Sequence, residues 1–242
     1  MHHRALAAAV LFVAAPLTQA DDLDLGLLLG VQDEFRLLSE DLGAALSYRP
    51  VAPGEPLGLL GFDVGIEATA TDLENTNVFR LATQSRNAPS YLVIPKLHVH
   101  KGLPWRFNVD AVYSAVPSSN IELVGGALGF SILEGGISMP ALTLRASATK
   151  LSGVDDLDLD TQSIELTVSK GFAMVTPYAG IGRVEVTSEP KGYAALVLRE
   201  ESFYLDKMYV GVNLNLGLLN LAVEGDKTGD ANSYSAKFGF RF

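Results

Sequence analysis

The stretch YSAKFGFRF, residues 234–242 at the end of the sequence, alternates apolar and polar side chains without a break. Tyr234, Ala236, Phe238, Phe240 and Phe242 share one face, and small or basic residues occupy the other. A period of two over this length is typical of a β-strand. On the exposed edge of a soluble sheet such an aromatic stripe would promote aggregation. The strand is therefore expected to lie against an apolar environment.

The composition restricts what that environment is. Of the 242 residues, 48% are hydrophobic and 19% are charged, and the mean hydropathy is +0.23. Outside the extreme N-terminus, no apolar run reaches the length of about 18 residues that a transmembrane helix needs. The longest uncharged stretch in the body, 208–223, contains three asparagines, which a helix would place in lipid. Two classes remain, a β-rich soluble core and a closed transmembrane barrel.

The segment 1–20, MHHRALAAAVLFVAAPLTQA, has the pattern of a secretory signal peptide. Arg4 gives a basic start, an apolar stretch follows, and Pro16 precedes a small-residue ending at Ala20. The apolar stretch is too short to span a bilayer, so cleavage after Ala20 is expected. The sequence contains no cysteine, which excludes a disulfide scaffold and a lipid-modified N-terminal cysteine.

The next segment, 21–42, does not alternate. Phe35, Leu38 and Leu42 recur at helical spacing, and Asp33 is placed to cap the start of a helix. We therefore predict a short N-terminal helix within 21–42, with the helix as a candidate plug. From residue 43 the pattern is almost wholly two-fold, and 43–242 is predicted to be an all-β, closed antiparallel transmembrane β-barrel.

The barrel segment contains eleven candidate strands. Because bacterial single-chain barrels have even strand counts, we expect twelve strands, with ten as the alternative. Counted back from residue 242, long polar connections largely alternate with tight ones, as in barrels of the outer membrane. The candidate strands are 44–50, 58–71, 91–101, 104–116, 120–133, 140–150, 162–170, 173–187, 203–215, 218–226 and 233–242.

The ending resembles the C-terminal assembly signal of Gram-negative outer-membrane β-barrel proteins, which carry a terminal Phe after alternating apolar residues. The resemblance implies that Tyr234, Phe238, Phe240 and Phe242 form the signal that the barrel-assembly machinery recognises. The chain is also similar to proteobacterial outer-membrane proteins with segments such as HVHKGLP (98–104) and NLNLGLLNLAVEGDKTGDANSYSAKFGFRF (213–242). These likenesses imply the cell outer membrane as location, and they imply no activity.

Charged side chains of both signs recur on the strand faces predicted to point inward. A small barrel is filled by such side chains, whereas a larger barrel leaves water. The sequence therefore predicts either a narrow pore or a plugged lumen. The predicted lumen-lining residues are Glu67, Lys96, His98, His100, Arg106, Asp110, Glu122, Arg145, Arg183 and Glu185, with Lys237 and Arg241 on the same inward face of the last strand.

His98 and His100 are the candidate chemical groups of this lumen. They favour either a proton-linked or anion-attracting constriction or, more simply, a lumen packed with salt-bridged polar residues. Outer-membrane lipid hydrolases place a catalytic Ser and His on the lipid-facing surface. Here the two histidines alternate with Leu97 and Val99, which belong to the lipid-facing set, so no catalytic residue is predicted.

No metal or cofactor site is predicted. Asp156, Asp158 and Asp160 are spaced as Ca²⁺ ligands can be, but the glycine turn and distal glutamate of an EF-hand loop are missing. A solvated acidic loop is the expected structure there. The net charge of −10 disfavours nucleic-acid binding. The resemblance to outer-membrane β-barrel proteins implies outer-membrane lipid and the barrel-assembly machinery as partners.

The function expected first is a passive narrow channel for small solutes or ions, without enzymatic activity. The first alternative is a structural or surface-interaction barrel with a filled lumen. The second is a membrane-embedded enzyme that modifies lipid. The sequence sets neither the solute nor the oligomeric state.

Overall fold

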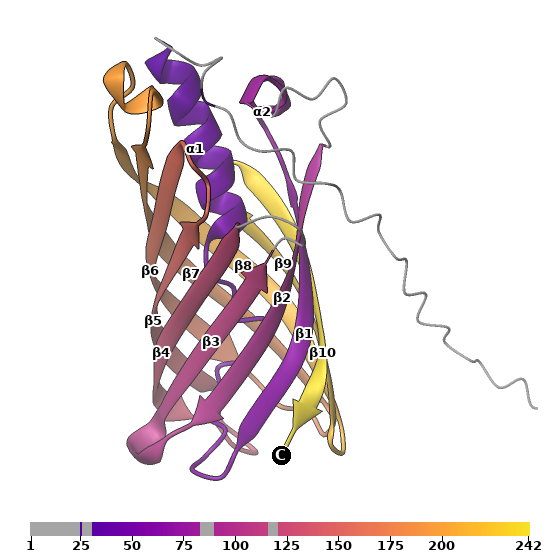
Figure 1. Cartoon of the computed structure of the whole chain (residues 1–242). Helices are drawn as coiled ribbons and strands as arrows, with labels where there is room; N and C mark the ends of the chain where they lie inside the picture. Colours follow the sequence, from indigo (N-terminus) through magenta and orange to yellow (C-terminus); the bar gives the residue numbers. More distant parts are fainter. Residues whose placement is uncertain (1–24, 26–30, 83–89, 116–120) are drawn as a thin grey trace, which may run out of the picture.

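The alternating stretch at the end of the sequence closes a barrel in the computed structural model (Figure 1). It forms β10 (Ala231–Arg241), which pairs antiparallel with β1 (Phe62–Asp72). Phe62 and Phe242 exchange two backbone hydrogen bonds, of 2.7 and 2.9 Å. The aromatic rings of Phe238 and Phe240 lie on the outer surface. Their role as an assembly signal stays a prediction.

The structure describes residue 25 and residues 31–82, 90–115 and 121–242. The signal peptide expected at 1–20 lies outside the described residues. No described helix is long and apolar enough to cross a membrane. The remaining elements are α1 (Gln32–Leu46), α2 (Thr76–Ala82), β2 (Tyr91–Gly102), η2 (Pro104–Arg106), β3 (Phe107–Ala115), β4 (Glu122–Glu134), β5 (Ala141–Ser152), β6 (Leu157–Ser169), β7 (Val175–Pro190), η3 (Ala194–Leu196), β8 (Glu201–Leu216) and β9 (Leu219–Thr228).

The described wall has ten strands, so the expected count of twelve is wrong and the alternative of ten is confirmed. The candidate strand at 44–50 does not exist, because α1 continues to Leu46 and the chain then runs irregularly to Gly61. Short apolar runs fit a helix or a strand equally well. Here Ala44, Ala45 and Leu46 complete the buried face of α1. The wall therefore begins at Phe62 and not at residue 43.

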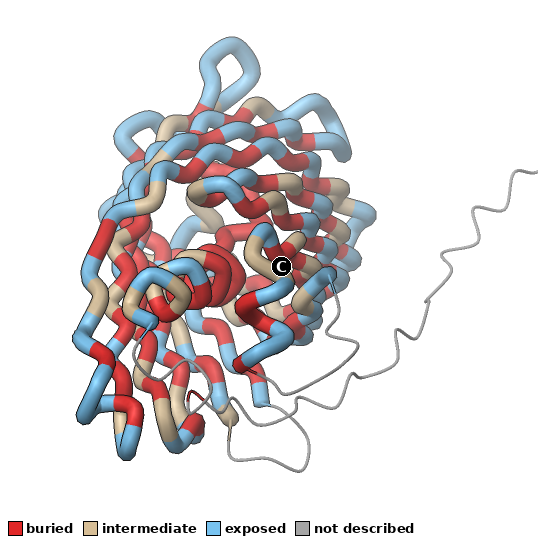
Figure 2. Tube along the Cα trace, turned by 90° about the horizontal axis from the view of Figure 1, so that it is seen from above, coloured by how far each residue is buried: buried red, intermediate tan, exposed pale blue. Residues whose placement is uncertain are grey.

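Helix α1 occupies the inside of one end of the barrel (Figures 1 and 2). Phe35, Leu38 and Leu42 are buried there, as their helical spacing predicts. Asp33 is not the N-cap, because Val31 holds that position and no side chain caps the helix start. Asp33 lies instead in the first turn, where a negative charge is favourable beside the exposed backbone N–H groups.

The two ends of the barrel differ. The turn end carries the connections β2–β3, β4–β5, β6–β7 and β8–β9 together with Phe242, and the loop end carries α2, η3 and the start of α1 (Figure 1). The alternation of connection lengths is weaker than the sequence indicated. The link between the candidate strands 218–226 and 233–242, which the alternation predicts to be long, is a tight turn because β9 runs to Thr228 and β10 starts at Ala231.

We call the half of the barrel next to the turn end the turn half. It has apolar side chains outside and polar side chains inside. Along β7, Val175, Pro177, Ala179 and Ile181 point outward. Every strand contributes large exposed apolar side chains to this band, which is the surface expected to face lipid. One residue from each strand illustrates it: Ile66, Leu97, Val109, Leu128, Leu144, Leu166, Ile181, Val210, Val223 and Phe238.

The alternation is inverted in the half next to the loop end, which we call the loop half: here the apolar side chains point inward and the polar side chains point outward. There β7 turns Arg183 outward and buries Val184 and Val186 completely, because the inward residues pack around α1. The approach is close, since a Cβ on Gly43 of α1 would lie 2.6 Å from Val186. On β5–β8 the loop half therefore has a polar exterior around an apolar core, as in a water-soluble barrel, whereas the apolar exterior predominates in the turn half.

Two inward tyrosines of the turn half pack against glycines of the neighbouring strand. Tyr178 pairs with Gly211, and Tyr209 pairs with Gly180. A Cβ on Gly211 would lie 2.3 Å from the ring of Tyr178, and a Cβ on Gly180 would lie 2.2 Å from the ring of Tyr209. The two glycines therefore make the space that both rings occupy.

Gly180→Ala should lower the free energy of unfolding by about 1–3 kcal/mol, because the new methyl group displaces the buried ring of Tyr209. Urea-induced unfolding in lipid vesicles measures this loss. The matched control is Gly225→Ala, whose Cβ would have its nearest neighbour at 3.8 Å. Equal losses for both variants would contradict the packing described for Tyr209.

Val210→Arg should destabilise the barrel in lipid by about 2–4 kcal/mol if Val210 lies near the bilayer midplane, and by less toward the interface. Val210 is exposed and belongs to the apolar band. The control is Ser202→Arg on the same face of β8, within the polar loop half. The same unfolding measurement compares them, and similar effects would refute the division into two halves.

Candidate functional site

The lumen of the turn half is the candidate functional site, and the chain between α1 and β1 runs through it. Residues 47–54 are buried throughout. Thr149 donates a 3.0 Å hydrogen bond to the carbonyl of Leu46 near the loop half, and the N–H of Leu57 donates one of 3.3 Å to Asn108 near the turn end. Pro50, Pro53 and Pro56 favour an extended backbone along this path. We call residues 47–57 the lumen segment.

Arg49 joins the lumen segment to α1 and to the wall. Its Nε donates to Asp226 of β9 at 2.6 Å, and its Nη2 donates to Ser233 of β10 at 2.6 Å. The guanidinium also donates to the carbonyls of Ala44 and Ala45 at 2.9 Å each. Those carbonyls end α1, so a cation there also complements the helix dipole.

Tyr48 makes two further contacts with the wall. Its carbonyl accepts a hydrogen bond from the ammonium of Lys207, which also pairs with Glu165 at 2.7 Å. Its hydroxyl lies 3.3 Å from Nε2 of His98, and the two rings meet edge to face. The lumen segment therefore has polar partners on both sides of the barrel.

The residues around the two histidines form an alternating row of charges. Glu67 pairs with Lys96 at 2.5 Å and with Nδ1 of His98 at 2.9 Å. Asp110 lies 3.4 Å from Nδ1 of His100, and its other oxygen lies 3.8 Å from Nε of Arg145. All of these side chains are buried inside the barrel.

A second group of charges lies near the turn end. Asp63 pairs with Lys237 at 3.3 Å and with Arg241 at 2.7 Å, across the seam between β1 and β10. Arg241 also donates to Asn213, which exchanges amide hydrogen bonds with Asn220. The closing seam thus carries its own ion pairs in addition to the backbone ladder.

The lumen of the turn half is nearly balanced in charge when the two histidines are left aside. Buried ions need a partner, since an unpaired charge inside a protein costs several kcal/mol. The described basic residues are Arg49, Lys96, Arg145, Lys207, Lys237 and Arg241, and the acidic residues are Asp63, Glu67, Asp110, Glu165, Glu224 and Asp226. Glu55 of the lumen segment adds a partly exposed carboxylate near the turn end, so six basic side chains face seven acidic ones.

Six of the ten residues predicted to line the lumen lie there: Glu67, Lys96, His98, His100, Asp110 and Arg145. The other four do not, and the correction has two physical reasons. Arg106 is part of the exposed turn η2 and pairs with Glu134 at 2.5 Å. Glu122, Arg183 and Glu185 point outward in the loop half, where the alternation is inverted.

Arg183 pairs there with Asp206 of β8 at 2.9 Å. Glu122 accepts a hydrogen bond from Tyr113 on the outer surface. The acidic stretch 154–161 is also different from the loop expected, because β6 starts at Leu157. Asp158 and Asp160 pair with Lys191 and Lys150 respectively, at 3.1 and 3.3 Å.

Sequence reasoning missed the residues that hold the lumen segment. Arg49 fell in a presumed strand. Glu165 stands between the outward Ile164 and Leu166, so its inward position was visible in the alternation. Lys207 lies between Asp206 and Met208, and the charged Asp206 on the outward face hides the alternation of apolar and polar side chains. Asp226 is the last residue of the candidate strand 218–226, within the polar run 224–227 that hides the alternation.

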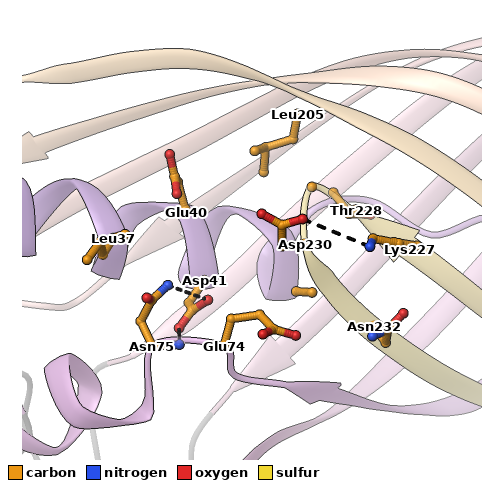
Figure 3. A pocket seen from close by; sticks show the side chains of 12 residues that line it. Leu37, Glu40, Asp41, Glu74, Asn75, Leu205, Lys227, Thr228, Asp230 and Asn232 are labelled. Carbon is orange, nitrogen blue, oxygen red and sulfur yellow. Dashed lines mark hydrogen bonds and ion pairs between the residues drawn. The ribbon is translucent and has the colours of Figure 1, made fainter.

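A cavity of about 510 Å³ opens at the loop end, between α1 and the β9–β10 turn (Figure 3). Glu40 and Asp41 of α1 line it together with Glu74 and the β9–β10 turn. Asp41 accepts hydrogen bonds from the backbone N–H and the side chain of Asn75, at 2.8 and 3.3 Å. Carboxylates thus predominate around this cavity, on the side of the molecule where α1 begins.

No protein-family model and no curated protein matches the sequence. Solved structures of outer-membrane barrels resemble this barrel at low identity. The β domain of the Bordetella autotransporter BrkA has a TM-score of 0.42 at 11% identity, over 75% of this chain and 99% of that one. The KdgM porin, solved with disordered oligogalacturonate, has a TM-score of 0.40 at 9% identity, over 74% and 99%.

OprG from Pseudomonas aeruginosa has a TM-score of 0.37 at 13% identity, over 79% of this chain and 99% of that one. All three TM-scores lie below 0.5, so the assignment of the fold depends on the strand pairing and exterior described above. A closed antiparallel barrel with an apolar outer band is the architecture of outer-membrane proteins. The protein is a β-barrel of the outer-membrane type.

Arg49→Met should destabilise the barrel by about 3–5 kcal/mol, because it leaves Asp226 buried without its cation. The double variant Arg49→Met/Asp226→Asn removes both charges and should recover a large part of that loss. Unfolding in lipid vesicles measures all three proteins. If the double variant is as unstable as the single one, the ion pair does not hold the lumen segment.

Proposed function

We propose that this protein is an outer-membrane barrel with a filled lumen, whose loop end serves surface interactions. The observation that carries the proposal is the lumen segment. It occupies the turn half from the level of Thr149 to the level of Asn108, where a channel would need a water-filled path. The first alternative drawn from the sequence is therefore preferred to the passive channel.

The lumen segment supplies partners for charged side chains of the wall, and these contacts favour a lumen that stays filled. Arg49 supplies the partner of Asp226, and the carbonyl of Tyr48 accepts from Lys207. The carbonyl of Gly54 accepts from Thr143 on β5. Withdrawal of the segment would break these bonds together and would leave buried ions without partners. Closure is thus favoured by several interactions along the whole path.

The loop end offers the features of an interaction surface. The β7–β8 connection exposes Tyr193, Leu196 and Val197, of which the first two are 84% and 79% accessible. Next to it, α1 and the β9–β10 turn frame the acid-lined cavity (Figure 3). Exposed loops on a rigid barrel are the usual place for recognition. A partner with basic and apolar groups would suit this end.

The proposal is tested by conductance in planar lipid bilayers. The intact protein should show no steady ion conductance, whereas a variant lacking residues 32–57 should conduct, because the charged lumen then fills with water. A second variant, Ser39→Cys/Ser188→Cys, fixes α1 inside the barrel. The hydroxyl oxygens of Ser39 and Ser188 lie 2.8 Å apart, and cysteines at these positions are placed to form a disulfide.

The Ser39→Cys/Ser188→Cys variant keeps the test decisive if the variant lacking residues 32–57 fails to fold. Silence of the oxidised Ser39→Cys/Ser188→Cys protein supports the filled lumen. Steady conductance of that oxidised protein would overturn the proposal and would restore the passive channel. The pairing control is Ser39→Cys/Ser235→Cys, since Ser235 bonds Thr69 in the wall and should form no disulfide with position 39.

A further inference from the structure

We infer that the barrel holds its own N-terminal segment across the membrane, so that the start of α1 lies on the external side. The inference rests on the filled lumen proposed above and adds a direction to it. Without passage through the lumen, the chain preceding β1 would stay on the side of the turn end. With this passage, the chain crosses the membrane once more than its ten wall strands require.

The wall itself begins and ends at the turn end. Phe62 and Phe242 are hydrogen-bonded to each other there, and the N–H of Gly102 at the end of β2 donates to Gly61 at 3.1 Å. Both ends of an even-stranded wall necessarily lie at the same end. The residue that enters the wall, Phe62, is therefore on the side of the short turns.

The start of α1 lies at the opposite end. The side-chain amide of Gln32 donates to the carbonyl of Arg199 at 3.0 Å, and the N–H of Arg199 donates back to Gln32 at 2.9 Å. Arg36 pairs with Glu201 at 3.1 Å and covers the ring of Phe203 at 3.8 Å. Arg199 and Glu201 belong to the β7–β8 connection and the start of β8, at the loop end.

The partners of the chain follow one direction between these two points. Ser39 is hydrogen-bonded to Ser188 in the loop half. Arg49 pairs with Asp226 at the limit of the apolar band that is nearer the loop end. Further along, Gly54 accepts from Thr143, and Leu57 then donates to Asn108 at the turn end. The chain thus passes the whole apolar band on the inside of the wall, where it meets polar side chains and no lipid.

The exterior assigns the two ends to the two sides of the membrane. In outer-membrane barrels the short turns are periplasmic and the longer loops are external. The turn end exposes Leu60, Trp105 and Leu218, which are 87%, 84% and 64% accessible, so it suits the membrane interface. The loop half has a polar exterior and projects into water. Gln32 therefore belongs to the external side.

Labelling of single cysteines in intact cells tests the inference, since the chain has no cysteine of its own. Val31→Cys places a thiol at the exposed residue before α1, and Asp33→Cys is a second variant in its first turn. A membrane-impermeant maleimide should label both in intact cells. Tyr193→Cys is the external reference and should react to the same extent.

Leu218→Cys at the turn end is the internal reference and should react only after the outer membrane is made permeable. If Val31→Cys and Asp33→Cys behave like Leu218→Cys while Tyr193→Cys reacts in intact cells, the inference is overturned. It is also overturned if Tyr193→Cys itself fails to react in intact cells, because the loop end is then not external. Conductance reports the filling of the lumen separately, so failure of the proposed function and failure of this inference are distinguishable.

Discussion

The contact on which the filled lumen depends is the set of hydrogen bonds made by Arg49. One buried guanidinium binds the last carbonyls of α1, the carboxylate of Asp226 and the hydroxyl of Ser233. A helix that ends inside a barrel leaves carbonyls without partners, and a wall carboxylate inside a barrel needs a cation. Arg49 satisfies both requirements at the level where the apolar core of the loop half meets the polar lumen of the turn half.

The change of core type along the barrel explains why one protein shows two opposite alternation patterns. In the turn half, lipid outside and ions inside place Ile181 outward and Tyr178 inward. In the loop half, water outside and α1 inside place Arg183 outward and Val184 inward. The strands keep a period of two throughout, so the period is set by the backbone, whereas the polarity of each face is set by what the face meets.

This difference also sets how much could be predicted. The final strand, the closed antiparallel barrel and the inward positions of Glu67, Lys96 and Asp110 follow from alternation alone. Glu122, Arg183 and Glu185 were assigned wrongly because one polarity was assumed along whole strands. The spacing of Phe35, Leu38 and Leu42 predicts the plug helix, but the sequence equally fits a strand where α1 extends through Ala44–Leu46. The role of Arg49 does not follow from the sequence, since its wall partners lie 177 and 184 residues further along the chain.

The exposed side chains at the limits of the apolar band have a consequence for the depth of the barrel in the bilayer. If the barrel moved outward, Ile164 and Met208, which are exposed apolar side chains at the loop-side limit of the band, would leave hydrocarbon for water, at a cost of about 25 cal/mol for each Å² of apolar surface. If it moved inward, the ion pairs Lys150–Asp160 and Arg183–Asp206 would enter hydrocarbon. Such pairs contribute little to stability in water, but burying them without water is expensive. The vertical position of the molecule is therefore restrained in both directions, and α1 is kept above the hydrocarbon layer.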